Sequence, residues 1–73
     1  MNIFSDSCID GVFNGWSGES VYKLANGQVW QQAAYSYRYC YLYRPRIRIL
    51  KYEYGYEMEV DGLEYRMPVK RIY

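Results

Sequence analysis

The stretch from Tyr35 to Arg44 alternates strictly between tyrosine and other residues, and this pattern constrains the fold more than any other feature of the chain. Successive side chains of a β-strand point to opposite faces, so a period of two predicts a strand with two unlike faces. One face carries Tyr35, Tyr37, Tyr39, Tyr41 and Tyr43, and the other carries Ser36, Arg38, Cys40, Leu42 and Arg44. Pro45 cannot donate to a ladder, so we expect the chain to bend there or to lie at a sheet edge.

Turn dipeptides before this stretch predict further strands. Residues 11–16 form the first expected strand, Ser17-Gly18 its turn, and residues 19–25 the second strand. Asn26-Gly27 is the strongest hairpin signal, because both positions of a type I′ turn need a positive φ, which Asn and Gly tolerate best. A two-residue turn there would set Tyr22 opposite Gln31.

The C-terminal third reads as a meander whose pieces support one another. Two-residue turns at Tyr54-Gly55 and Asp61-Gly62 place Ile49 opposite Val60 and gather the apolar residues on one face. That face holds Ile47, Ile49, Met58, Val60, Leu63, Tyr65 and Met67, and the opposite face holds Arg48, Tyr52, Glu57, Glu59, Glu64 and Arg66.

Helix signals are weak throughout, so we predict an all-β fold: a small SH3-like barrel of five to six short antiparallel strands. Closure of a bent meander hides edges that would otherwise pair with other chains. The chain of 73 residues is expected to form one domain over residues 11–73, after an irregular or short helical lead-in over residues 1–10. A domain this short has a thin core and often completes its burial by association.

Several segments together resemble a known family. They are Phe13 to Gly18, Val21 to Gln32 with its Asn-Gly-Gln-Val-Trp core, Arg44 to Ile49, Gly55 to Gly62, and Val69 to Arg71. The combination resembles a family of small uncharacterised bacterial β-domain proteins that includes proteins encoded by integron gene cassettes. The resemblance covers roughly residues 11–72. It implies an SH3-like barrel or half-barrel and implies no activity.

Charge is distributed in blocks although the net charge is only +1. Residues 1–19 carry acids only, residues 20–52 bases only, and residues 53–64 acids only. We interpret this as pairing between basic and acidic strands of one sheet. A basic face that binds a partner is the alternative.

Candidate chemistry is sparse. The chain has two cysteines, Cys8 and Cys40, and no histidine, so neither a zinc site nor a catalytic cysteine is expected. No cofactor site is predicted, and Glu57 and Glu59 are expected in solvent beside Arg48 and Arg66. Without an export signal we expect a cytoplasmic protein with reduced thiols. No apolar run approaches the ~20 residues of a membrane span.

The candidate functional residues form two groups. The first is an interaction surface of Tyr35, Tyr37, Arg38, Tyr39, Tyr41, Tyr43 and Arg44, and the second is an aromatic groove of Trp16, Trp30 and Gln32. Both tryptophans are interpreted first as core residues, with the groove as their functional alternative, and the glutamines could equally satisfy buried backbone groups. Part of the tyrosine face could cover the core and leave the rest as an exposed edge. Tyrosine is also enriched where proteins meet, so we predict a non-enzymatic module that forms a homo-oligomer or binds a protein partner. Alternatives are a single-stranded nucleic-acid binder that uses tyrosine stacking and arginine contacts, and a small ligand-binding or enzymatic barrel with a site between subunits.

Overall fold

The structure, a computed structural model, describes residues 2–18 and 20–73, and within those residues the chain forms eight strands and no helix. The all-β prediction is therefore confirmed. The strands are β1 (Asn2–Cys8), β2 (Val12–Ser17), β3 (Val21–Lys23), β4 (Val29–Gln32), β5 (Tyr37–Tyr43), β6 (Arg46–Tyr52), β7 (Gly55–Val60) and β8 (Arg66–Arg71).

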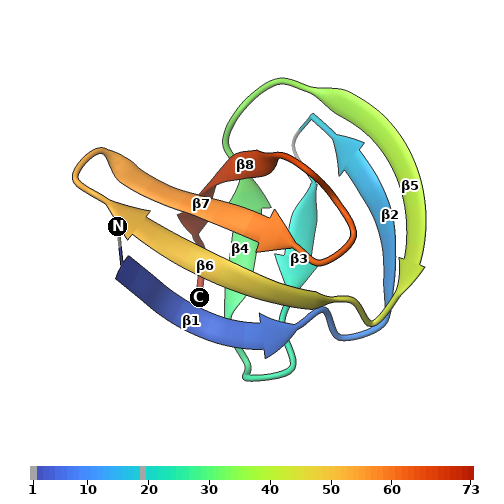
Figure 1. Cartoon of the computed structure of the whole chain (residues 1–73), viewed down its shortest axis with the longest axis horizontal. Coiled ribbons are helices and arrows are strands. Elements are labelled where there is room, and N and C mark those ends of the chain that lie inside the picture. The colour runs from blue at the N-terminus through green and yellow to red at the C-terminus, as the bar shows by residue number, and fades with distance from the viewer. Residues whose placement is uncertain (1, 19) are drawn as a thin grey trace.

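The strands form two antiparallel sheets (Figure 1). Six strands pair in the order β1-β6-β7-β8-β4-β3, and β2 pairs with β5 in a separate ribbon. The number of strands among the described residues exceeds the predicted five to six, in part because β1 has a weak sequence signal. The Ser17-Gly18 turn does not join a hairpin, since β2 pairs with β5 and the next strand, β3, pairs with β4.

The expectation of an irregular or helical lead-in is wrong. Residues Asn2–Cys8 form β1, which lies antiparallel to β6 with Asp6 opposite Arg48 and one irregularity between Ile3 and Ser5. Asparagine and aspartate, which β1 contains as Asn2 and Asp6, have low strand propensity, so the local sequence gives little strand signal. Pairing with β6 supplies the order that propensity does not.

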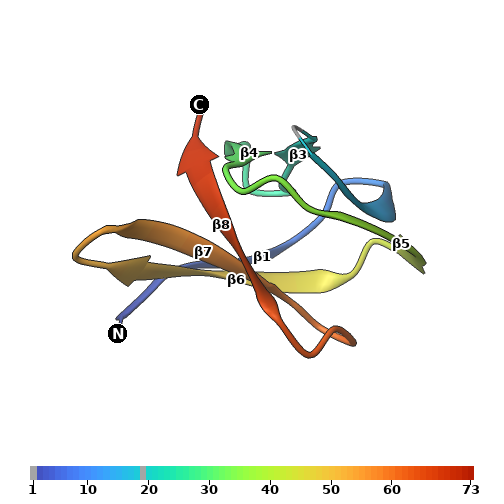
Figure 2. The ribbon, with the colours of Figure 1, turned by 90° about the horizontal axis from the view of Figure 1, so that it is seen from above.

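The two edge strands of the larger sheet meet at one point. Ile9, just after β1, forms a single bridge with Leu24, just after β3. The Ala25 amide donates to the Cys8 carbonyl and the Asp10 amide to the Lys23 carbonyl, both at 2.8 Å. Figure 2 shows how the sheet reaches this contact: β8 runs steeply from the level of β6 and β7 to the level of β4 and β3. The sheet therefore curls until its ends touch.

The hairpin at Asn26-Gly27 lies where the sequence predicts it, but the turn type is wrong. Only Gly27 of the two has a positive φ, +91°. The Gly27 amide donates to the Leu24 carbonyl at 3.0 Å, and the Leu24 amide to the Gln28 carbonyl at 2.9 Å, so the loop has one more residue. This register sets Tyr22 opposite Trp30 instead of Gln31, which places both large rings on the buried face.

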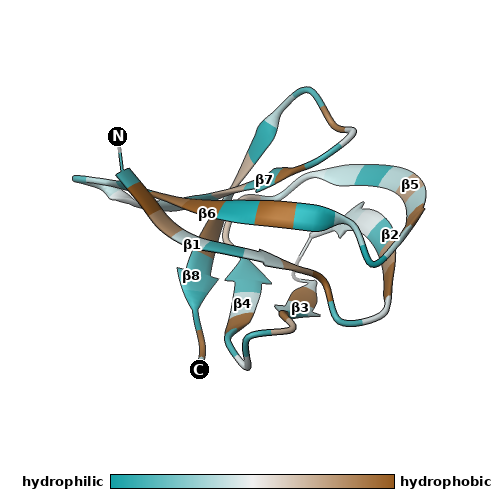
Figure 3. Ribbon diagram, turned by 60° about the horizontal axis from the view of Figure 1, so that its bottom comes forward, coloured by the Kyte–Doolittle hydropathy of each residue, from teal (hydrophilic) through white to brown (hydrophobic). Residues whose placement is uncertain are grey.

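The C-terminal meander has the predicted faces with a shifted register. Ile49 pairs with Met58 instead of Val60, and the first turn is residues 53–54. The second connection is longer than two residues, and Met58 pairs with Met67. Because each shift is even, no side chain changes face. The predicted apolar face is confirmed: Ile47, Ile49, Met58, Val60 and Met67 are buried, with Leu63 and Tyr65 partly buried against them. Figure 3 shows the resulting alternation of polar and apolar residues along β6.

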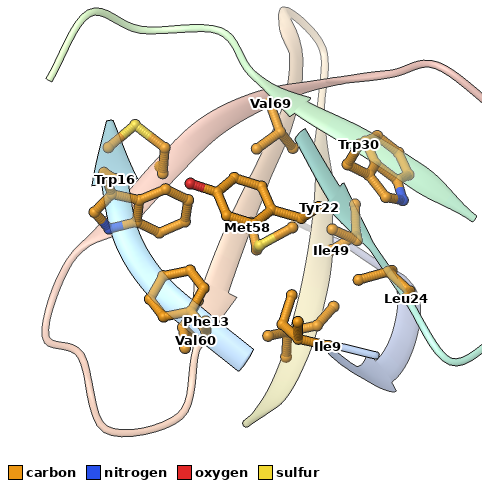
Figure 4. Close-up of a cluster of buried hydrophobic side chains, with 12 residues drawn as sticks. Ile9, Phe13, Trp16, Tyr22, Leu24, Trp30, Ile49, Met58, Val60 and Val69 are labelled. Carbon is orange, nitrogen blue, oxygen red and sulfur yellow. The ribbon is translucent and has the colours of Figure 1, made fainter. Parts of the chain in front are cut away.

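β2 of the ribbon contributes Phe13 and Trp16 to the buried aromatic cluster, where they join Tyr22 and Trp30 of the curled sheet (Figure 4). Phe13 and Trp16, both from β2, are buried, and their ring centroids lie 5.2 Å apart in an edge-to-face arrangement. The ring centroid of Tyr22 on β3 lies 5.5 Å from that of Phe13 and 5.3 Å from that of Trp16. These aromatic contacts hold the ribbon against the sheet.

The bend expected at Pro45 is confirmed. β5 ends at Tyr43 and β6 begins at Arg46 in the other sheet. Arg44 between them has a φ of +47°, and the Ile9 amide donates to the Pro45 carbonyl at 3.0 Å. The chain therefore passes from the ribbon to the sheet at the residue that cannot continue a ladder.

Tyr22 makes a buried hydrogen bond whose loss can be measured. Its hydroxyl donates to the Gly15 carbonyl at 2.7 Å, and burial raises its pKa above 10.0, partly offset by a hydrogen bond from Ser20. We expect Tyr22→Phe to lower the free energy of unfolding at pH 7 by about 1 kcal/mol. The raised pKa favours the neutral phenol in the folded state, so its contribution is complete below about pH 10 and is lost as pH rises through the folded pKa.

Urea denaturation at pH 7 and across the alkaline range checks both statements. The stability of Tyr22→Phe should fall less steeply above about pH 10 than that of the natural chain, because one shifted phenol is missing. Equal alkaline slopes for the two proteins would show that burial of this hydroxyl does not control the alkaline response.

Candidate interaction surface

All five tyrosines of the alternating stretch lie on the outside of the molecule. We call Tyr35, Tyr37, Tyr39, Tyr41 and Tyr43 the tyrosine stripe. Their exposed fractions lie between 59% for Tyr41 and 79% for Tyr35. Four of them belong to β5, which is the outermost strand of the ribbon in Figure 1. The stripe therefore contributes little to the core of the isolated chain.

The opposite face of β5 determines this orientation. Leu42 is partly buried against the core, and Phe13, its partner on β2, is fully buried. Cys40 is half-buried on the same face. Since alternate residues of a strand point to opposite sides, burying Leu42 turns the tyrosines to solvent.

Contacts within and beside the stripe order part of it. The Tyr37 hydroxyl donates to the Tyr35 hydroxyl at 2.8 Å, and their rings lie edge to face with centroids 5.2 Å apart. The Arg38 guanidinium lies over the Tyr65 ring, 5.2 Å from its centroid. Arg44 forms an ion pair with Asp10 at 3.5 Å. Both predicted arginines thus lie beside the stripe, and each has a partner within the chain.

The other arginines of the basic segment also pair with acids. Arg46 contacts Asp6 at 3.2 Å, and Arg48 contacts Glu59 at 2.6 Å. Glu59 also accepts from Arg66 at 3.2 Å. The interpretation of the charge blocks as cross-strand pairing is therefore confirmed, and Arg44, Arg46 and Arg48 do not form an uncompensated basic face.

The predicted aromatic groove is wrong. Trp30 is fully buried and Trp16 exposes 2% of its surface, so neither ring lines a groove open to a ligand. The Gln32 side chain is buried as well. It accepts from the Ser17 amide at 3.1 Å and donates to the Ala34 and Ser36 carbonyls, each at 2.9 Å. The interpretation of both tryptophans as core residues is confirmed, as is the alternative interpretation of Gln32 as a residue that satisfies backbone groups.

Other aromatic clusters were not anticipated from the sequence. Phe4 of β1 lies 6.0 Å from Trp30 and 5.1 Å from Tyr56, measured between ring centroids. Tyr52 and Tyr54 stack at 5.1 Å beside the turn between β6 and β7. The sequence did not indicate that Phe4 would join an aromatic cluster, because its segment was not predicted to be a strand. The tyrosine pair depends on a turn position that the sequence placed one residue too late.

Groups suited to catalysis or metal binding do not gather in the described part of the chain. Cys8 and Cys40 are free and half-buried, and they lie on strands of different sheets. No group of three or more potential metal ligands is found among residues 2–18 and 20–73. The same residues contain no helix of the length and apolar character that a membrane crossing requires. Glu57 accepts a hydrogen bond from the exposed Tyr54 hydroxyl at 3.2 Å.

Comparison of the chain with protein-family models, with curated proteins and with solved structures gave no match.

Proposed function

We propose that the chain is a non-enzymatic interaction module that assembles with copies of itself through the tyrosine stripe. The observation that carries this proposal is the exposure of all five stripe tyrosines, four of which lie on the outermost strand of the ribbon. A monomer that keeps five large rings in water, four of them on one strand, leaves their apolar area unused. Tyrosine offers large contact area with little rotamer entropy to lose, which suits a protein interface.

The fold supports a compact platform for this surface. We propose that the curled six-stranded sheet, with its ends joined at Ile9 and Leu24, and the covering ribbon correspond to an SH3-like barrel. We also propose that the chain belongs to the family of small bacterial β-domains that it resembles. Support comes from the resemblance-bearing residues Trp16 and Trp30, which are core residues, and Gly27, which has the turn conformation. The free thiols Cys8 and Cys40 suit a reducing compartment, and we propose the cytoplasm.

Single-stranded nucleic acid is a less suitable partner. Phosphate binding depends on basic side chains that can release counterions. Arg44, Arg46 and Arg48 already pair with acids of the same chain. A ligand-binding or catalytic site between subunits would need a polar side chain that has no partner within its own chain. Glu59 does not meet this condition, because it already forms ion pairs with Arg48 and Arg66.

The mass of the purified protein in solution tests the proposal. We expect a multiple of the chain mass by native mass spectrometry and light scattering. Tyr39→Ser combined with Tyr41→Ser should weaken association about 1,000-fold or more, since each of the two associating copies loses two tyrosines that contribute roughly 1–2 kcal/mol apiece. Both side chains are exposed, so the circular dichroism spectrum should not change.

Tyr54→Ser is the matched control. Tyr54 is 73% exposed, as the stripe tyrosines are, but lies in the turn between β6 and β7. This variant should associate like the natural chain. A monodisperse monomer at millimolar concentration, or equal effects of the stripe and control variants, would refute the proposal. A single chain that carries bound oligonucleotide would replace it with the nucleic-acid hypothesis.

A further inference from the structure

β5 offers a second chain a free hydrogen-bonding edge. Among the described residues, β2 is the only strand that pairs with β5. An unpaired strand edge presents a row of amide and carbonyl groups that can accept another strand. The same strand carries most of the tyrosine stripe, so a copy added at this edge would meet both backbone groups and rings.

The contacts with β2 show which backbone groups point to the free edge. The Arg44 amide donates to the Gly11 carbonyl at 2.8 Å, and the Gly18 amide donates to the Ser36 carbonyl at 3.0 Å. Between them, the Arg38 carbonyl oxygen and the Cys40 amide nitrogen lie closest to the position that a Cβ atom on Gly15 of β2 would take. Even-numbered residues of β5 thus direct their backbone groups to β2. Because these directions alternate along a strand, the amides and carbonyls of Tyr39, Tyr41 and Tyr43 point away from β2.

This alternation limits how two copies can pair. A two-fold axis perpendicular to the ribbon brings the free edges of two β5 strands together as antiparallel neighbours with their tyrosines on one face. Hydrogen-bonded pairs must then join odd-numbered residues. With the axis at Cys40, the middle residue of Tyr37–Tyr43, Tyr39 pairs with Tyr41 of the second copy and the strands overlap along their whole length. An axis at Tyr39 or Tyr41 gives a shorter overlap.

We propose that the chain forms a two-fold dimer in which the free edges of two β5 strands pair antiparallel about Cys40. The two ribbons then become one four-stranded sheet with an unbroken tyrosine face. This inference rests on the proposed self-association and adds its mode, register and symmetry.

Charge and geometry are compatible with this register. Arg38 comes opposite Leu42 of the second copy, so no two arginines of β5 face each other directly. Cys40 comes opposite Cys40 of the second copy in a non-hydrogen-bonded pair, where Cα atoms lie about 4.5 Å apart. Disulfides span Cα separations of about 4.4–6.8 Å, so the two thiols could be joined without backbone movement. This pairing supplies a direct test.

Diamide oxidation of the natural chain in dilute solution tests the register. Two thiols would lose two electrons and two protons to diamide, which is reduced to the hydrazine, and an intermolecular disulfide would form. Trypsin releases Cys40 in fragment 39–46 and Cys8 in fragment 1–23, so mass spectrometry identifies the linked cysteines. We expect most of the chain to become a dimer linked through two copies of fragment 39–46. The Cys8→Ser variant should cross-link as well as the natural chain does. The Cys40→Ser variant should form at most one-tenth as much disulfide-linked dimer as the natural chain.

The outcomes separate this inference from the proposed function. A native dimer that does not cross-link through Cys40, or links through Cys8 instead, overturns the edge pairing and leaves self-association intact. A monomer that does not cross-link overturns both. Tyr39→Pro adds a backbone test, because proline removes an amide that points away from β2. Beside Tyr39→Ala, which removes the same ring, Tyr39→Pro should reduce dimer formation at least tenfold further, and equal effects would overturn the pairing.

Discussion

Gly15→Ala is expected to remove most of the stability of the fold. Gly15 lies on β2 with a φ of +94°, and a Cβ atom there would lie 2.0 Å from the Arg38 carbonyl oxygen and 2.7 Å from the Cys40 amide nitrogen. Both are backbone atoms of β5, so no side chain can move aside to make room. We expect a loss of about 4 kcal/mol or more, the range of the most severe single substitutions. A domain of this size has roughly 4–11 kcal/mol in total.

Gly27→Ala is the matched control for backbone conformation. Gly27 has nearly the same φ, +91°, and nothing lies within 4 Å of its missing Cβ. This substitution should cost only the left-handed backbone penalty, about 1–2 kcal/mol. Urea denaturation of both variants measures the difference, which isolates the close approach of β2 to β5. Equal losses in the two variants would mean that the strands can separate enough to admit a methyl group.

The same glycine illustrates what the sequence could not predict. A glycine inside a strand pattern indicates a bulge or a close backbone approach, but the pattern does not say which strand approaches. The register between β2 and β5 shifts between Phe13 and Gly15, and β5 follows β2 only after two other strands. Sequence neighbours suggested a hairpin between β2 and β3. The actual pairing follows from the aromatic core, where Phe13 and Trp16 need the space beside Tyr22.

Local patterns predicted faces better than registers. The alternation of Ile47, Ile49, Met58 and Val60 identified the buried face correctly, although the pairs differ from those expected. In this meander the centre of each turn lies one residue away from its predicted position. Such a difference shifts the cross-strand pairing by two residues and leaves each side chain on its predicted face. At Asn26-Gly27 the shift was odd, and burial of Tyr22 and Trp30 decided the register against the simplest turn.

The candidate site was predictable in composition but not in direction. The alternation around Tyr39 required a two-faced strand, yet both faces contained residues that could be buried. The face that carries Leu42 is the buried one, because its cross-strand partner Phe13 belongs to the core. The charge blocks were more informative, because long-range pairing of Arg46 with Asp6 and of Arg48 with Glu59 follows from opposite charges in neighbouring strands.

Gln32→Leu is expected to have the second large effect, because one buried amide serves three backbone groups. Gln32 lies at the end of β4, where its side chain joins Ser17 of β2 to Ala34 and Ser36 in the connection that leads to β5. Leucine fits the volume but makes none of these bonds. Buried groups left without partners cost about 1–3 kcal/mol each, and since water can reach part of this connection we expect a total loss of about 2–4 kcal/mol.

Gln32→Glu separates hydrogen bonding from packing at the same position. A glutamate keeps the acceptor for Ser17 and loses both donors, and its charge would face the carbonyls of Ala34 and Ser36. Burial and these carbonyls should raise the pKa of the new carboxyl group in the folded state, so the variant should gain stability as the pH falls towards 4. Gln32→Leu should show no such gain relative to the natural chain. If both variants lost less than about 1 kcal/mol at pH 7, the amide would not hold the β2–β5 ribbon, and the tyrosine stripe would depend on the aromatic core alone for its position.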